Sequence, residues 1–369
     1  MKVVTIIGTR PEIIRLACII KKLDTYYDHI LVHTGQNWDP KLHNIFFTEL
    51  NLRQPDYQLD IVGSNLGETM GNAISYTYSL LKELNPDAVL ILGDTNSALS
   101  VISAKRLKIP VFHMEAGNRC FDETVPEEIN RRIVDHTSDI NLPYTEHARR
   151  NLLNEGMKAD RIIVTGSPLT EVYTTYAENI NIVDIQKLNL TARKYILWST
   201  HREENIDIPR NWNLVIECIN SVASYYPSMT IVVSVHPRTR HRITDTNVTF
   251  PENVELRDPF GLFEYIALQK QAFCIISDSG TISEEAAILN VPAVSFRSCT
   301  ERPEAIDKGN ISFSSLNCSN LLLAIQLATR IRSDNPPIPH DYIDPNVSDR
   351  IVKLISSYVP LVNEIVWRK

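Results

Sequence analysis

Polar side chains that can take or give a proton follow several short apolar runs of this sequence. Asp94 follows residues 88–92, Glu115 follows residues 111–113, and His201 follows residues 195–199. Parallel strands bring their carboxyl ends to one edge of a sheet, so we expect a site for acid–base chemistry there. Each position also has a structural interpretation, because Asp94 could cap the next helix and His201 could be an ordinary loop histidine.

Glu127 is a further acid–base candidate with two interpretations. Thr124 and Glu127 match the S/T-x-x-E pattern, which would make Glu127 part of a capping box. A second glutamate, Glu128, follows directly, and the cap needs only one of the two. Both the structural and the chemical interpretation of Glu127 are therefore open.

Two turns are typical of phosphate binding. The segment Gly8-Thr9-Arg10-Pro11-Glu12 follows an apolar run at residues 3–7, and residues 278–285 follow another at residues 273–276. A strand-to-helix turn with glycine presents backbone N–H groups and the positive end of a helix dipole. Pro11 suits position N1 of a helix, and Arg10 could pair with phosphate or lie on the surface beside an ordinary cap. Two such turns, one in each half, predict a site for a ligand with a diphosphate.

Composition and missing motifs exclude other classes. The 369 residues carry a net charge of −7 without a basic block, so neither nucleic acid nor an anionic membrane surface is an expected partner. No apolar run approaches the roughly 18 residues of a membrane span, and no signal-peptide pattern precedes the first strand. The six cysteines and the scattered histidines lack metal-ligand spacing, so we expect no metal, reduced thiols and a cytoplasmic protein. The absence of GxSxG, Walker A and GxGxxG segments argues against hydrolase, P-loop and nicotinamide chemistry.

Short β-branched runs alternate with helix-like stretches along the chain. Further strands are predicted at residues 30–33, 139–142, 161–164, 230–233, 254–256 and 291–296, and helices at residues 13–23, 72–84 and 145–155. This alternation predicts an α/β protein whose mostly parallel sheets are covered on both faces. The pattern pauses near residues 166–190, so we expect domains at residues 1–168 and 169–347. A helix at residues 348–369 is expected to pack back on the first domain.

Seven segments, in order, resemble the non-hydrolysing UDP-N-acetylglucosamine 2-epimerase family. They are Gly8-Thr9-Arg10-Pro11-Glu12, Gly93-Asp94-Thr95, Glu115-Ala116-Gly117, Pro126-Glu127-Glu128 with Asn130-Arg131, His201-Arg202-Glu203-Glu204-Asn205, Asp278-Ser279-Gly280 with Glu284-Glu285, and Glu301-Arg302-Pro303-Glu304. The resemblance spans nearly the whole chain. It implies a GT-B fold with two Rossmann-like domains that face a central cleft. It also implies a homodimer that uses no added cofactor.

The resemblance implies inversion at C2 of a UDP-2-acetamido sugar. UDP is eliminated to leave a 2-acetamidoglycal, and is then added back while a proton reaches the opposite face. The family pattern assigns Asp94, Glu115 and Glu127 to acid–base work, and His201 to the departing diphosphate. It assigns the substrate to Arg10, Arg15, His236, Ser279, Gly280, Glu284 and Arg302, with Glu284 on the ribose hydroxyls. Removal of a weakly acidic C2 proton needs a carboxylate of raised basicity, which a dry, closed cleft would supply. Which carboxylate serves which face stays open.

Two segments depart from the family's pattern. Arg15 stands where the family usually has lysine, and Asn37-Trp38-Asp39 stands where His-Arg often occurs. In the family the second segment helps to bind an activating UDP-N-acetylglucosamine, so the departure puts that activation in question. Together with residues 114–122 and 199–205, these departures resemble the branch that makes UDP-N-acetyl-L-fucosamine from UDP-2-acetamido-2,6-dideoxy-L-talose for surface polysaccharides. Trp38 could favour the methyl group of a 6-deoxy sugar.

Other functions fit parts of the sequence. UDP-N-acetylglucosamine is the alternative substrate for the same reaction. A GT-B glycosyltransferase would share the fold and the UDP site but would need an acceptor groove, and a nucleotide-sugar sensor would bind without turnover. A hydrolysing epimerase would release free sugar and UDP. Acidic groups for both faces of the sugar favour the non-hydrolysing epimerase.

Overall fold

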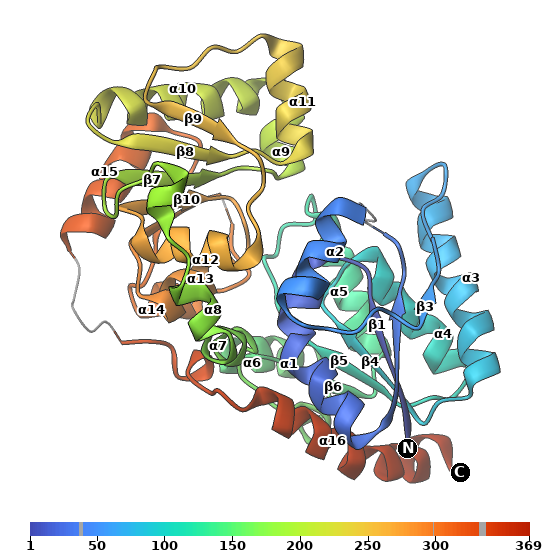
Figure 1. The fold of residues 1–369 in the computed structure, drawn as a ribbon. Helices are drawn as coiled ribbons and strands as arrows, with labels where there is room; N and C mark the ends of the chain where they lie inside the picture. Colours follow the sequence, from blue (N-terminus) through green and yellow to red (C-terminus); the bar gives the residue numbers. More distant parts are fainter. Residues whose placement is uncertain (37–39, 298, 332–336) are drawn as a thin grey trace. The chain divides into compact units, whose positions relative to one another are not determined.

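The structure is a computed structural model that describes residues 1–36, 40–297, 299–331 and 337–369. The chain forms two compact units, each described by itself below: Met1–Tyr176 with His340–Lys369 (unit 1), and Ala177–Pro339 (unit 2) (Figure 1). The segment Asn37-Trp38-Asp39 lies outside the described residues, so the role of Trp38 stays a prediction. Across the described ranges, no helix combines the length and apolar character that crossing a membrane requires.

Unit 1 contains a parallel six-stranded sheet in the order β3-β2-β1-β4-β5-β6. Its strands are β1 (Lys2–Ile7), β2 (Asp28–His33), β3 (Tyr57–Gln58), β4 (Ala88–Leu92), β5 (Val111–Met114) and β6 (Ile140–Leu142). Its α-helices are α1 (Arg10–Tyr26), α2 (Pro40–Glu49), α3 (Leu66–Leu84), α4 (Val101–Arg106), α5 (Pro126–Thr137), α6 (Glu146–Asn154), α7 (Leu169–Thr175) and α16 (Val347–Val362). The strand order reverses between β1 and β4, so the turns after these two strands are neighbours, as at the ligand site of doubly wound folds.

Unit 2 repeats this topology with the order β12-β11-β10-β7-β8-β9. Its strands are β7 (Tyr195–Ser199), β8 (Thr230–Ser234), β9 (Val254–Arg257), β10 (Cys274–Ser277), β11 (Ala293–Phe296) and β12 (Ser312–Ser314). Its α-helices are α8 (Ala177–Asn181), α9 (Glu203–Ile206), α10 (Pro209–Tyr225), α11 (Pro237–Thr246), α12 (Leu262–Gln271), α13 (Ile282–Leu289), α14 (Glu304–Asp307) and α15 (Cys318–Arg330). Here the order reverses between β7 and β10, which makes the turns after these strands neighbours.

Both faces of the sheet in unit 2 are covered by helices, as predicted from its apolar strands. Successive residues of β7 enter different cores: Ile196 and Trp198 pack with α10 and α15, whereas Tyr195 and Leu197 pack with α12 and α13. Side chains alternate between the two faces of a strand, so a strand buried on both faces must be apolar throughout. The sheet is therefore a rigid base for the turns at its carboxyl edge.

One predicted strand is wrong. Residues 161–164 form no strand: a 3₁₀ turn at Ala159–Arg161 is followed by a single bridge between Ile162 and Asn141. Ile162 buries its side chain against Ala116 and Leu152, so its hydrophobicity is satisfied without a strand. Conversely, strands β3 and β12, which are only two and three residues long, were not predicted.

The chain passes from unit 1 to unit 2 between residues 176 and 177 and returns to unit 1 between residues 339 and 340. The predicted boundaries lay between residues 168 and 169 and between residues 347 and 348. Helix α7 belongs to unit 1, where it packs on α1, and the Tyr176 hydroxyl donates to the Leu50 carbonyl over 2.6 Å. Helix α16, red in Figure 1, also packs on α1, with Lys22 Nζ 2.7 Å from Asp349 Oδ1. The C-terminal segment thus returns to the N-terminal unit.

Candidate active site

The turn between β1 and α1 is closed by its own glutamate. Glu12 Oε2 accepts hydrogen bonds from the N–H groups of Gly8 at 2.5 Å and Thr9 at 3.2 Å, and Oε1 accepts one from Thr95 Oγ1 at 2.9 Å. The prediction that this turn presents unpaired N–H groups to a phosphate is therefore wrong for Gly8 and Thr9. The N–H groups of both residues already donate to the Glu12 carboxylate. The Glu12 contacts instead join the turns after β1 and β4. Burial raises the pKa of Glu12 to about 7, against these hydrogen bonds, which lower it.

Arg10 is the first residue of α1, which puts Pro11 one position later than predicted. The guanidinium of Arg10 lies over the Phe46 ring, 5.6 Å from its centroid. Arg15 is one turn further along α1 and is buried, with Nε 3.9 Å from Glu115 Oε2 and its guanidinium 5.6 Å from the centroid of the Tyr144 ring. The arginine that replaces the family's lysine therefore lies beside a predicted acid–base group.

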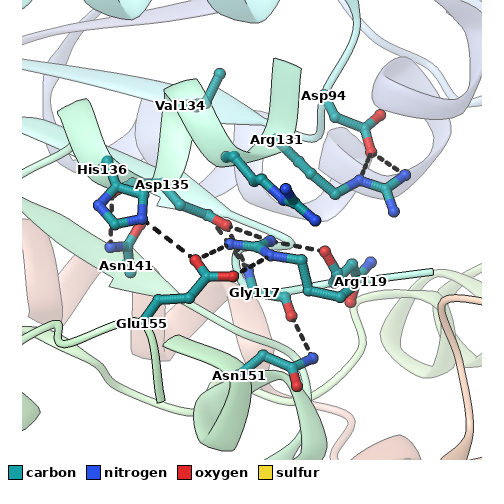
Figure 2. A network of polar contacts seen from close by, with 12 residues as sticks. Asp94, Gly117, Arg119, Arg131, Val134, Asp135, His136, Asn141, Asn151 and Glu155 are labelled. Atoms are coloured by element: carbon teal, nitrogen blue, oxygen red, sulfur yellow. Dashed lines mark hydrogen bonds and ion pairs between the residues drawn. The ribbon is translucent and has the colours of Figure 1, made fainter. Parts of the chain in front are cut away.

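Asp94 follows β4 and pairs with an arginine of α5. Arg131 Nε and Nη2 lie 2.9 and 2.7 Å from Asp94 Oδ2 (Figure 2). Nη1 of Arg131 lies 2.9 Å from Glu128 Oε2. The alternative role of Asp94 as a helix cap is wrong, since the next helical turn has Thr95 at its N-cap and no side-chain cap. Arg131 fixes the Asp94 carboxylate by a charge-assisted pair.

Glu115 directly follows β5 and has a strained conformation. Its φ of 65° lies in the left-handed region, which non-glycine residues seldom adopt. The Glu115 side chain accepts from Asn118 Nδ2 at 3.3 Å, and its Oε2 lies 4.0 Å from the position that a Cβ on Gly93 would occupy. The structure therefore brings Glu115 next to the turn that carries Asp94, as the shared sheet edge predicted.

Glu127 lies on the first turn of α5, which begins at Pro126. The capping-box interpretation requires Thr124 as the N-cap, but the N-cap is the next residue, Val125, and no side chain caps this helix. The capping-box interpretation of Thr124 and Glu127 is therefore wrong. The neighbouring Glu128 is the buried glutamate, and it accepts from the Cys120 N–H at 3.1 Å. Burial alone would raise the pKa of Glu128, but the Cys120 N–H and the Arg131 charge hold it below its usual value.

His201 follows β7 and is held by Asp278, which follows β10. Asp278 is fully buried, and its carboxylate accepts from the N–H groups of His201 at 3.1 Å and Arg202 at 3.0 Å and from Asn205 Nδ2 at 2.9 Å. His201 Nδ1 lies 3.2 Å from Asp278 Oδ1, and about two fifths of the His201 side chain is exposed (39%). This arrangement orients the imidazole, as carboxylates do in other His–Asp pairs. His236 is exposed, with its ring 6.2 Å from that of His201.

The turn into α13 brings the remaining predicted residues of unit 2 together. Ser279 Oγ lies 3.0 Å from Thr281 Oγ1. A Cβ on Gly280 would lie 2.1 Å from Glu301 Oε1, so the turn has room only for glycine as it stands. Glu284 is buried on the first turn of α13, with its Oε2 3.2 Å from Nη1 of the equally buried Arg302. Arg302 compensates the buried charge of Glu284, and both oxygens of a carboxylate are hydrogen-bond acceptors.

Several buried charged residues beside the candidates had no role assigned from the sequence. Glu12, Glu128, Asp135 and Asp278 each bind backbone or arginine groups of the turns that carry the candidates. The helical spacing of Glu128, Arg131 and Asp135 on α5 was an available signal, because residues three, four and seven apart share a face. Within the described residues, no three His, Cys, Asp or Glu side chains gather as metal ligands.

Comparisons with known proteins show the family and the fold of this chain. The family model for UDP-N-acetylglucosamine 2-epimerase matches residues 21–356. A solved UDP-N-acetylglucosamine 2-epimerase from Rickettsia bellii is 41% identical, with full coverage of both chains and a TM-score of 0.92. The Methanocaldococcus jannaschii UDP-GlcNAc 2-epimerase, solved in complex with UDP-GlcNAc and UDP, is 34% identical over 97% of this chain and 100% of its own, with a TM-score of 0.91.

A relative with another sugar in its name is also similar. The UDP-2,3-diacetamido-2,3-dideoxy-D-glucuronate 2-epimerase of Pseudomonas aeruginosa is 34% identical over 315 residues, which cover 84% of this chain and 87% of the relative. The predictions of a GT-B-type α/β fold with two parallel sheets and of an isomerase are thereby confirmed. The chain belongs to the UDP-N-acetylglucosamine 2-epimerase family.

Proposed function

We propose that the protein inverts C2 of a UDP-2-acetamido sugar by eliminating UDP and adding it back. The observation that carries the proposal is the set of carboxylates at the carboxyl edge of the unit 1 sheet, two of which have arginine partners: Asp94 with Arg131, and Glu115 with Arg15. A reaction that removes a proton from one face of a carbon and returns one to the other needs two such groups. A third candidate, Glu127, lies on α5.

In the first step a carboxylate removes the C2 proton while the bond between C1 and the UDP oxygen breaks. The electron pair of the C2–H bond forms the double bond of the 2-acetamidoglycal, and UDP leaves with the electrons of the C1–O bond. In the second step the UDP oxygen bonds to C1, and an acid delivers a proton to the other face of C2. No atom is gained or lost, so the product is the C2 epimer.

Unit 2 is proposed to hold the UDP. His201 offers its outer imidazole nitrogen to the departing diphosphate, because Asp278 lies beside the inner one. The remaining nucleotide and sugar contacts are assigned to Ser279, Gly280, His236 and Arg302 of unit 2. Arg10 and Arg15 of unit 1 are assigned to the substrate as well. Glu284 is assigned to the ribose hydroxyls, since its buried carboxylate is an acceptor held by Arg302.

The proposed substrate is UDP-2-acetamido-2,6-dideoxy-L-talose, which would give UDP-N-acetyl-L-fucosamine for a surface polysaccharide. This rests on the sequence departures described above, one of which, at Trp38, lies outside the described residues. UDP-N-acetylglucosamine is the second candidate, because the similar Rickettsia and Methanocaldococcus proteins are named as epimerases of this sugar. A homodimer that works in the cytoplasm completes the proposal.

The purified enzyme should be incubated with each of the two nucleotide sugars and the products separated by anion-exchange chromatography. We expect conversion of the 6-deoxy-L-sugar to its C2 epimer with no accumulation of UDP. Conversion of UDP-N-acetylglucosamine alone would replace the substrate and keep the reaction. Accumulation of UDP with free sugar would indicate a hydrolysing enzyme, and binding without conversion would indicate a sensor or a transferase that lacks its acceptor.

A further inference from the structure

The turn that carries Glu115 is held by a buried aspartate of α5. The N–H of Gly117 donates to both carboxylate oxygens of Asp135, at 3.2 and 3.1 Å. The Gly117 carbonyl accepts from Asn151 Nδ2 at 2.9 Å, as Figure 2 shows. Gly117 has a φ of 81°, and a Cβ there would lie 2.3 Å from the Ala148 carbonyl oxygen. The backbone two residues after Glu115 is therefore fixed on both sides.

The same aspartate also reaches the turn that carries Asp94. His113, a buried residue of β5, places Nδ1 2.9 Å from Asp135 Oδ1 and Nε2 2.8 Å from the Gly93 carbonyl oxygen. Gly93 directly precedes Asp94. Asp135 thus contacts one acidic turn directly and the other through a single side chain.

Arg119 compensates the buried charge of Asp135. Its Nη1 donates to Asp135 Oδ2 at 2.7 Å and to the Asn118 carbonyl at 2.7 Å, while Nε and Nη2 lie 2.7 and 2.6 Å from the two oxygens of Glu155 (Figure 2). Buried charges of this kind are stable only when paired and fully hydrogen-bonded. Gly117 and Arg119 both donate hydrogen bonds to Asp135, which gives the turn after β5 little freedom to move.

We propose that Asp135 is a positioning residue that fixes Glu115 and Asp94 relative to each other. The inference rests on the proposed function, because it takes these two carboxylates as the acid–base groups. A displacement of about 1 Å of a reacting group can cost about 100-fold in rate. Asp135 itself acts through the backbone of Gly117 and through His113, and it does not need to contact the substrate.

Asp139, which directly precedes β6, provides a matched control because it also contacts β5. It is as buried as Asp135, and its carboxylate accepts from the Val111 N–H at 3.0 Å and pairs with Lys105. Val111 begins β5, whereas Glu115 follows its last residue, so Asp139 holds the far end of the strand. The change Asp139→Asn removes a buried charge from unit 1 without touching the acidic turns.

The test compares Asp135→Asn and Asp139→Asn in the full-length enzyme with its converted nucleotide sugar. We expect both to lower the melting temperature, but only Asp135→Asn to lower kcat, by about 100-fold, with KM within about threefold of the wild type. Hydrogen exchange at the Gly117 amide should accelerate in Asp135→Asn alone. Equal losses of kcat in both variants, or an unchanged kcat in Asp135→Asn, would overturn the proposal. If Asp135→Asn fails to fold, Asp135→Glu keeps the charge opposite Arg119 and should show the same loss of kcat.

A double-mutant cycle separates positioning from general damage. If Asp135 acts through Glu115, adding Asp135→Asn to Glu115→Gln should cost little, whereas adding it to His201→Asn should cost the full factor. A similar cost in both backgrounds would contradict the proposal. A wild-type enzyme that epimerises no nucleotide sugar would refute the proposed function instead, and the exchange rate at Gly117 would still decide whether Asp135 holds the turn.

Discussion

Replacing Glu12 by glutamine should remove a large part of the pH dependence of the stability of unit 1. The Glu12 carboxyl is 2% exposed and closes the turn between β1 and α1. Burial raises its pKa from 4.5 to about 7, although the donors at Gly8, Thr9 and Thr95 oppose the shift. The folded protein therefore binds the Glu12 proton more tightly than the unfolded chain does.

The sign and the size follow from this difference. Between pH 4.5 and pH 7 the folded state keeps a proton that the unfolded state releases, so the free energy of unfolding falls as pH rises. The contribution is fully present below pH 4.5 and is lost as the pH passes 7. A difference of 2.5 units (7 − 4.5) corresponds to about 3 kcal/mol at about 1.36 kcal/mol per unit.

Urea unfolding of the wild type and of Glu12→Gln should be followed by circular dichroism from pH 4.5 to pH 8. The free energy of unfolding of the wild type, minus that of the variant, should fall by about 3 kcal/mol over this range. The exposed Glu68 is the control, because hydrogen bonds from Ser64 lower its pKa and Glu68→Gln should not reproduce the fall. A difference between wild type and Glu12→Gln that stays constant or rises with pH would refute the reasoning.

Three further substitutions test the candidate site. Gly280→Ala puts a Cβ 2.1 Å from Glu301 Oε1, so the affinity for UDP measured by calorimetry should fall by about tenfold, and an unchanged affinity would exclude close contact at this turn. Asp278→Asn should lower kcat by about 100-fold and add little in a His201→Asn background, whereas additive losses would show that Asp278 acts elsewhere. Arg131→Lys removes the guanidinium group that contacts both Asp94 and Glu128, so kcat in steady-state assays should fall by at least about tenfold. Full activity of this variant would show that a positive charge alone is sufficient.

The candidate positions at strand ends were predictable because they depend on local pattern. Apolar runs followed by polar turns identified the strands before Asp94, Glu115 and His201, and their parallel pairing then brought them to the carboxyl edges. The false strand at residues 161–164 shows the limit of this signal. An apolar run can bury itself in a loop when neighbouring elements cover it.

The partners of these groups were harder to predict. Asp135 and Asp278 contact turns that are distant in sequence, so their roles depend on tertiary packing that no local pattern encodes. Glu12 was an exception, since Thr9 and Glu12 carry the same S/T-x-x-E spacing that was applied, wrongly, to Thr124 and Glu127. The capping pattern was informative, but it described the first helix and not the fifth.

The most direct test of the proposed chemistry is proton exchange at C2 of the sugar. The enzyme should be incubated in deuterated water with UDP-2-acetamido-2,6-dideoxy-L-talose and, in parallel, with UDP-N-acetylglucosamine, and the products followed by proton NMR. We predict that the C2 epimer forms with deuterium at C2 and with UDP still attached. A C2 epimer that forms without deuterium at C2 would contradict exchange of the C2 proton with solvent. The absence of exchange with either sugar would contradict deprotonation at C2 and favour a glycosyltransferase.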